Sequence, residues 1–273
     1  MSNYDFDSEM VTLYTQLMKS PLKGTNIWEE INKGNLACVP SSVGKEYDNS
    51  NLRLLYVGRA INGWERDFTA ATSDEMTEQI LKQHVTIHDD IVNRSGFKSV
   101  GAKRAYYHKN YNFWRLLRFI LAQSGDAIGG DSDWFQDANA SKWNQKFVWS
   151  NLYKVAPKAG KNPDSATKKA QIEICMDILQ KELEPYKPQL SLFVTGDDWF
   201  SSSWKGMKSF QNIPNLRYEK VMDKPYIEGI GICNDTRIVV CKRPDPFGKT
   251  IQFAAQMAKE IYRAYLDINE NNH

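Results

Sequence analysis

The sequence predicts an α/β protein in which helices cover both faces of a central, parallel, four-stranded sheet. Four short runs of aliphatic and β-branched residues alternate with longer segments of helical periodicity, which is the pattern of a parallel sheet with covered faces. Each run also ends in a polar loop, and in open parallel sheets ligands bind at those strand tips. The predicted strands span residues 52–58, 147–151, 190–195 and 237–241.

The helices are predicted from apolar spacing and from start and stop signals. Met10 and Leu17 share one face of a helix that Pro21 ends. Residues 113–121 are apolar nearly all round, so this helix should be buried. Other helices are expected over 75–88, where a Thr-Ser-Asp-Glu capping box opens the run, over 165–185, and from residue 250 onward.

Length and composition indicate one globular domain with an extension. Of the 273 residues, 41% are hydrophobic and 25% charged, and 35 Lys and Arg against 33 Asp and Glu leave a net charge of +2. This balance gives no bulk attraction to nucleic acid, so any nucleic-acid surface must be a local patch. We expect residues 1–50 to form a helical extension packed on the core and residues 51–268 to form the main domain.

The cysteines and histidines give no reason to expect a metal or another cofactor. The four Cys include no Cys-x-x-Cys pair, and the His84 and His88 spacing alone is more typical of surface side chains than of a metal site. No run approaches the ~18 to 20 apolar residues that a bilayer needs, and unpaired thiols suit a reducing compartment. We therefore expect a cytoplasmic protein without a membrane segment.

Two of the predicted strand tips carry residues suited to binding. Asn151 ends the second strand, where it either binds a ligand or only makes an Asx turn. After the first strand, Gly58 is followed by Asn62 and Gly63, and a Gly with positive φ lets backbone N–H groups face a ligand. The alternative, an Asn-Gly hairpin turn, fits less well with the helix predicted next.

A basic, tyrosine-rich segment spans residues 98–111. Single-strand binders combine cations for phosphates with flat rings for bases, and this segment interleaves both kinds of side chain. A solvated basic helix start is the alternative. The cationic or ionisable residues are Lys98, Lys103, Arg104, His108 and Lys109.

The strand tips together resemble the uracil-DNA glycosylase superfamily over residues 52–266. The sequence Val-Trp-Ser-Asn-Leu-Tyr-Lys at 148–154 is similar to the Asn-x-x-Lys segment of the thermophile-type glycosylases. Gly-Arg-Ala-Ile-Asn-Gly at 58–63 keeps the Gly of the family's first loop but has neither its acidic residue nor its Pro. Arg-Pro-Asp-Pro at 243–246 resembles the family's His-Pro-Ser-Pro loop, with Arg for His and Asp for Ser.

The resemblance implies a four-stranded α/β/α fold and a role for each matched tip. Asn151 would read the Watson–Crick edge of a flipped base, Arg243 would stabilise the leaving base and Asn62 would position water. The expected stacking side chains are Trp64 and Phe68. The expected phosphate-binding residues are Gly63, Lys154, Lys158 and Lys249.

The leading hypothesis is a divergent uracil-DNA glycosylase-like protein of DNA repair. It would bind a flipped base of nucleic acid, DNA rather than RNA, and if active would hydrolyse the N-glycosidic bond without a metal ion. One alternative is a Mg²⁺-dependent phosphate-ester hydrolase or transferase that acts on a small molecule and uses Asp197 and Asp198 at the third tip, with Asp245 at the fourth. A catalytically silent interaction module is the other.

Overall fold

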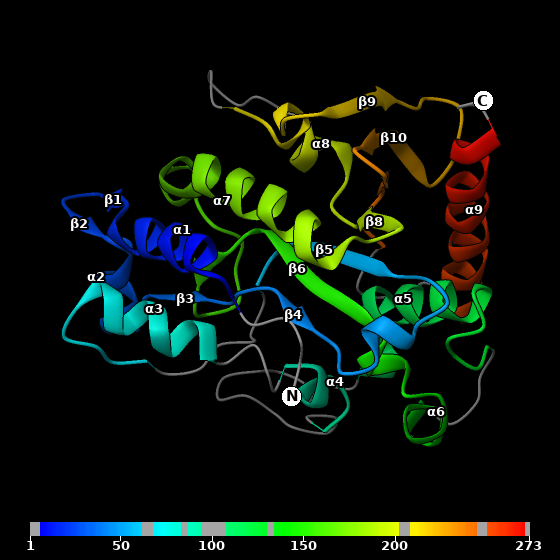
Figure 1. Ribbon diagram of the computed structural model, residues 1–273, viewed down its shortest axis with the longest axis horizontal. Helices are drawn as coiled ribbons and strands as arrows, with labels where there is room; N and C mark the ends of the chain where they lie inside the picture. Colours follow the sequence, from blue (N-terminus) through cyan, green and yellow to red (C-terminus); the bar gives the residue numbers. More distant parts are fainter. Residues whose placement is uncertain are drawn as a thin grey trace.

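A seven-stranded mixed sheet forms the centre of the protein (Figure 1). The computed structural model describes residues 6–61, 68–82, 87–93, 108–129, 134–201, 208–244 and 250–270. The strands of the central sheet, in spatial order, are β4 (Ser42–Val43), β6 (Phe147–Tyr153), β5 (Leu54–Ala60), β8 (Leu190–Phe193), β11 (Thr236–Cys241), β10 (Ile227–Cys233) and β9 (Leu216–Lys220).

The predicted α/β class is confirmed, and the sheet is larger than expected. All four predicted strands are present as β5, β6, β8 and β11, and each pairs in parallel with its neighbours in the order β6, β5, β8, β11. Antiparallel strands extend the sheet on both sides, because β4 pairs with β6 while β10 pairs with β11 and β9. The sheet therefore has seven strands rather than four.

Helices cover both faces of the central sheet. On one face α5 (Asn112–Gln123) and α9 (Ile251–Glu270) share an apolar core with Tyr56 and Trp149. On the other face α7 (Ser165–Tyr186) and α8 (Asp197–Phe200) pack against Val57 and Val148. Side chains of adjacent strand residues point to opposite faces, so the same strands supply both cores.

The N-terminal segment forms an outer layer on α7 and also joins the central sheet. Helices α1 (Ser8–Lys19), α2 (Ile27–Asn32) and α3 (Ser73–Lys82) share an apolar cluster with α7, in which Tyr14 and Ile178 are fully buried. Strand β3 (Leu36–Cys38) pairs antiparallel with β7 (Val155–Pro157). Because β4 pairs with β6, residues 1–50 contribute a strand to the sheet in addition to helices.

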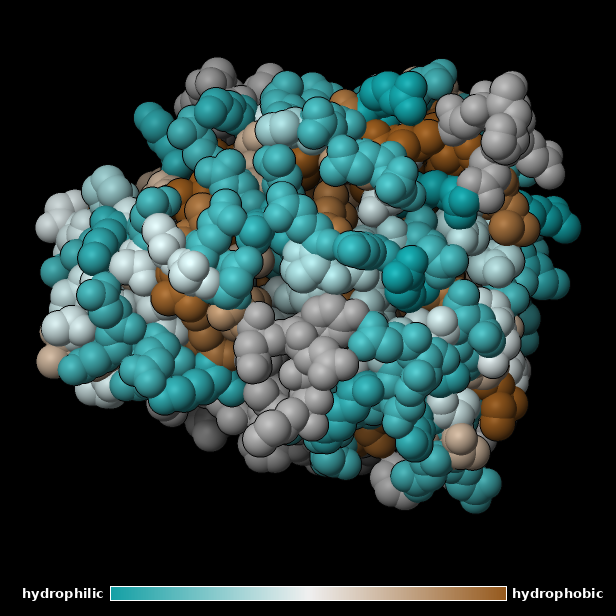
Figure 2. All heavy atoms as spheres, in the orientation of Figure 1, coloured by the Kyte–Doolittle hydropathy of each residue, from teal (hydrophilic) through white to brown (hydrophobic). Residues whose placement is uncertain are grey.

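The remaining elements are short. They are the strands β1 (Pro21–Leu22) and β2 (Thr25–Asn26), the helices α4 (Ile87–Asn93) and α6 (Trp134–Ser141), and the 3-10 turns η1 (Tyr47–Asn49), η3 (His108–Asn110), η4 (Trp143–Gln145) and η6 (Phe210–Asn212). In the view of Figure 2 hydrophilic side chains cover most of the surface, and hydrophobic ones show in the spaces between elements.

Local capping explains where the long helices begin. The carboxylate of Asp7 accepts a hydrogen bond from the Met10 N–H at the start of α1, and that of Asp164 accepts one from the Thr167 N–H at the start of α7. At the start of α3 the Thr72 hydroxyl accepts from the Glu75 N–H at 3.2 Å, as the predicted capping box requires. These caps satisfy N–H groups that have no partner within the helix.

Candidate functional site

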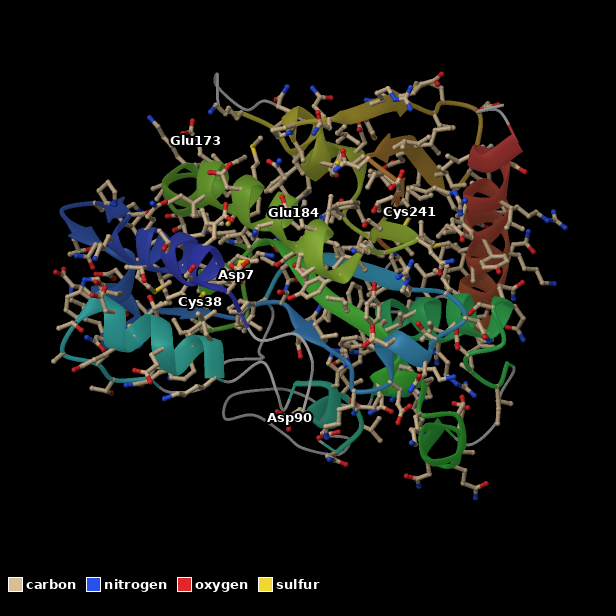
Figure 3. All side chains as sticks on the ribbon, in the orientation of Figure 1. Asp7, Cys38, Asp90, Glu173, Glu184 and Cys241 are labelled. Atoms are coloured by element: carbon tan, nitrogen blue, oxygen red, sulfur yellow. The ribbon has the colours of Figure 1, made fainter. Side chains whose placement is uncertain are left out.

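The carboxyl ends of the four parallel strands meet at one edge of the sheet. Gly58 lies opposite Asn151 in the pairing of β5 with β6, and Val57 lies opposite Phe193 in the pairing of β5 with β8. Cys241, labelled in Figure 3, is the last residue of β11. This edge is where the sequence places its candidate binding residues, so we call it the tip edge.

Asn151 is buried at the tip edge with its amide turned toward α5. The residue is 3% exposed, and a Cβ added to Gly58 would lie 2.7 Å from its Oδ1 and 3.5 Å from the Phe113 ring. Among the described residues, none hydrogen-bonds to the Asn151 side chain. The amide atoms are not among the fully enclosed polar side-chain atoms without a partner in the described part of the chain, so the amide keeps contact with solvent and is open to a ligand.

Gly58 and Phe113 shape the space beside the Asn151 amide. A Cβ at position 58 would lie 2.7 Å from the amide oxygen, so a larger residue there would displace the Asn151 amide. The Phe113 ring is partly buried and packs against Tyr56 with the ring centroids 4.7 Å apart. An apolar ring thus lies next to a polar amide, and this combination suits a planar ligand with a hydrogen-bonding edge.

Lys154 does not lie at the binding surface. Its ammonium is fully buried and donates to Glu182 Oε1 at 2.7 Å and to Ser150 Oγ at 2.6 Å. The Ser150 hydroxyl in turn donates to Glu182 Oε2 at 2.8 Å. The expectation that Lys154 holds a phosphate is therefore corrected, because its charge is neutralised inside the protein and has no exposed surface.

Phe68 also has a role different from the one expected. It is half-buried and packs against the apolar cluster of α1, α3 and α7, so the structure gives its ring a core contact in place of a stacking role at the tip edge. Lys158 is half-buried beyond β7, and its backbone N–H donates to the Asn35 carbonyl.

Arg59 and Trp199 form a cationic and aromatic group on the α7 side of the tip edge. The Arg59 guanidinium donates to the Thr195 carbonyl and to Asp198 Oδ1, the latter at 3.2 Å, and lies 4.9 Å from the centre of the Trp199 ring. Lys168, from the first turns of α7, places its ammonium 3.6 Å from the centre of the same ring. The Trp199 indole thus makes cation–π contacts with two positively charged side chains.

Electrostatics at this group reflect crowding of positive charge. Burial lowers the pKa of Arg59, and the positive charge of Arg243 lowers it further. The carboxylate of Asp198 opposes this shift. The pKa of Lys168 is lowered by burial and then by Arg59, again against Asp198. Arg243 is exposed just beyond β11, so the predicted leaving-group residue does lie within electrostatic reach of the β5 tip.

Asp197 and Asp198 are engaged by cations of the chain itself. Asp197 Oδ1 accepts from the Tyr218 hydroxyl at 2.6 Å, and its Oδ2 lies 2.6 Å from the Lys220 ammonium. Asp198 is paired with Arg59. Within the described ranges, no group of three or more His, Cys, Asp or Glu could hold a metal ion. Both carboxylates would have to leave their partners to bind Mg²⁺.

Several predicted residues lie outside the part of the chain that the structure describes. These are Asn62, Gly63, Trp64, Asp245, Lys249 and most of the basic segment 98–111. They include Asn62, which was predicted to position the catalytic water, and the predicted phosphate-binding residues Gly63 and Lys249.

Sequence reasoning missed Phe113, Arg59, Lys168 and Trp199. Phe113 belongs to a helix that is apolar nearly all round, so nothing in its own segment distinguishes it from core residues. Lys168 was one of many lysines in a long helix, and only the packing of α7 on the sheet brings it to Trp199. Arg59 follows Gly58 directly, and that position was the one available signal.

The sequence matches no protein-family model, and no curated protein matches it at a significant level. No helix among the described residues has the length and apolar character required to cross a bilayer.

Proposed function

We propose that this protein binds a flipped base of nucleic acid at the tip edge, with the Asn151 amide reading the base. The observation that carries this proposal is the amide of the buried residue Asn151, which has no hydrogen-bond partner among the described residues, keeps contact with solvent and lies beside Gly58 and Phe113. An amide offers two N–H donors and one carbonyl acceptor. The Watson–Crick edge of a uracil-like base offers the complementary N–H and carbonyl groups.

The fold supports the same proposal. Four parallel strands with helices on both faces support it, since the resemblance to the uracil-DNA glycosylase superfamily implies such a core, here extended by three antiparallel strands. In such sheets ligands bind beyond the carboxyl ends of the strands. Asn151 lies two residues before the carboxyl end of β6, and Phe113 supplies an apolar ring for the face of the base.

Hydrolysis of the N-glycosidic bond is the activity we infer for this site. Bond cleavage leaves an anionic base and an oxocarbenium-like sugar, so a positive charge near the base lowers the barrier. Arg243 supplies such a charge from the end of β11 and keeps it at all relevant pH values. Within the proposal Asn62 positions the attacking water, while DNA is the expected substrate and its repair the expected context.

An assay on modified oligonucleotides tests this function. Purified protein in EDTA is incubated with single- and double-stranded DNA that carries uracil, hypoxanthine or xanthine. Alkaline strand scission reports hydrolysis and fluorescence anisotropy reports binding. The variants are Asn151→Ala and, as a matched control, Asn162→Ala at an exposed position of the loop after β7.

We expect a preference for at least one modified base, lost in Asn151→Ala and kept in Asn162→Ala. Removing a bidentate contact to a base costs about 1 to 3 kcal/mol, so discrimination should fall about 5- to 150-fold. Binding of a modified base without scission supports a base-binding protein that does not hydrolyse. Equal discrimination by wild type and Asn151→Ala, or no binding of any substrate, would contradict the base-reading role.

A further inference from the structure

Arg59 and Lys168 sit on the opposite side of the tip edge from the Asn151 amide. Along β5, Gly58 faces Asn151 and the Phe113 side, whereas Arg59 contacts Trp199. Adjacent residues of a strand point to opposite faces, so the two groups flank one edge only a residue apart on β5. A chain crossing this edge would meet the amide on one side and the cations on the other.

Positive charge exceeds negative charge in this group. Arg59 is paired with Asp198, but no described carboxylate lies within ion-pair distance of the Lys168 ammonium. Arg243 adds a further positive charge to the surroundings of Arg59. The carboxylates of Asp198 and Glu228 thus face the three cations Arg59, Lys168 and Arg243, and an anion placed there would be attracted by the one uncompensated positive charge.

Geometry holds the cations in place before any ligand arrives. The Arg59 Nε–H donates to the Thr195 carbonyl, which fixes the guanidinium on the β8 side. The Lys168 ammonium rests over the Trp199 ring, and Trp199 packs edge-on against Tyr153 with the centroids 5.8 Å apart. Ordering these side chains in advance reduces the entropy lost on binding.

We propose that Arg59, Lys168 and Trp199 form a phosphate-binding site for the backbone of a single nucleic-acid strand whose base is held at Asn151. The assignment of a nucleic acid as ligand rests on the proposed function, whereas the affinity for a phosphate group follows from the charges alone. Guanidinium and ammonium groups are the usual partners of phosphate oxygens, and an indole beside them can stack on a neighbouring base. This site takes the role that sequence reasoning gave to Lys154.

The first experiment measures the site with inorganic phosphate. Thermal unfolding of the wild type is compared in sodium phosphate and in sodium chloride of equal ionic strength, together with Lys168→Gln and Lys169→Gln. Lys169 is the adjacent, exposed lysine of the same helix and serves as the matched control. We expect phosphate to raise the midpoint of wild type and Lys169→Gln by more than that of Lys168→Gln, which keeps only the general stabilisation by an excluded salt.

The second experiment measures binding of a labelled single-stranded oligonucleotide as a function of salt. Each phosphate contact on a single strand contributes about 0.7 to the slope of log K against log salt. A variant that loses one contact therefore loses about fivefold more affinity at 0.1 M salt than at 1 M salt. Lys168→Gln should show that loss, whereas Lys169→Gln should keep the slope of the wild type.

The two variants separate failure of this site from failure of the proposed function. If Lys168→Gln matches Lys169→Gln in both experiments, or if wild type responds to neither phosphate nor oligonucleotide, the phosphate site is wrong. If Lys168→Gln loses affinity while Asn151→Ala keeps its base discrimination, the phosphate site stands and base reading fails. A response to inorganic phosphate without oligonucleotide binding would refute the nucleic-acid strand as its ligand.

Discussion

The buried ion pair between Lys154 and Glu182 gives a sharp test of the reassignment of Lys154. Both side chains are 0% exposed, and their charges meet at 2.7 Å with the Ser150 hydroxyl bridging them. Replacing Lys154 with Met leaves an unpaired carboxylate inside the protein. Breaking one partner of a buried pair costs about 3 to 5 kcal/mol.

The expected loss is large enough for a thermal melt. At about 2 to 4 °C per kcal/mol for chains of 150–250 residues, Lys154→Met should lower the unfolding midpoint by about 6 to 20 °C. Glu182→Leu should do the same, since it strands the ammonium. The double variant Lys154→Met with Glu182→Leu should recover most of the loss, because apolar replacement of a whole buried pair is often neutral.

The control is the exposed pair of Lys82 with Glu78 on α3. Both of its side chains are more than half exposed, so Lys82→Met should change stability by less than about 1 kcal/mol. The assignment of Lys154 to a buried ion pair fails if Lys154→Met melts within about 2 °C of wild type, which corresponds to about half a kcal/mol. It also fails if the double variant is as unstable as the two single losses added together.

Three further outcomes are expected. Asn151→Ala should change stability by less than about 1 kcal/mol in a denaturant titration, because its amide has no described partner to lose, and a drop of several kcal/mol would indicate a structural role instead. Lys23 and Thr167 lower the pKa of Asp164 to about 2 from 3.8, so its stabilisation of α7 is complete above pH 4 and lost as pH falls toward 2. Accordingly Asp164→Ala should cost about 1 kcal/mol at pH 7 and almost nothing at pH 2, while Asp164→Asn retains most of the cap; a pH-independent difference would count against this. All four cysteines are buried as free thiols, and burial raises the pKa of Cys175 to about 12. A thiol reagent should therefore label the native protein slowly and should reach all four thiols only after unfolding. Rapid labelling of the native protein would contradict this expectation.

The parallel strands were predictable because each is a continuous apolar run, buried on both faces. The added strands were not. β4 has only two residues, and β9 is a strand of mostly charged residues in which Leu216 and Tyr218 alone are partly buried. β10 contains Gly229 and Gly231, and a Cβ at Gly231 would lie 2.4 Å from the Arg217 carbonyl oxygen. Glycines that read as loop residues are in fact required by a close approach of strands.

At the tip edge, local sequence placed Asn151 near the end of a strand but misassigned Lys154. Both belong to one short segment, and its basic, Pro-containing continuation suggested an exposed loop. The residue that decides the outcome for Lys154 is Glu182, which lies 28 positions later on α7. Such a pairing leaves no trace in the pattern around either residue, whereas the end of a strand is visible in the apolar run itself.

The two outer strands of the central sheet have a consequence for how the protein meets other chains. A sheet margin with free backbone N–H and carbonyl groups invites pairing with a strand from another molecule. One margin here is β4, which is only two residues long, and the other is β9, where Arg217, Glu219 and Lys220 are exposed. A short edge strand and a charged edge strand both disfavour pairing with strands of other molecules. This protein should therefore resist fibre formation at high concentration.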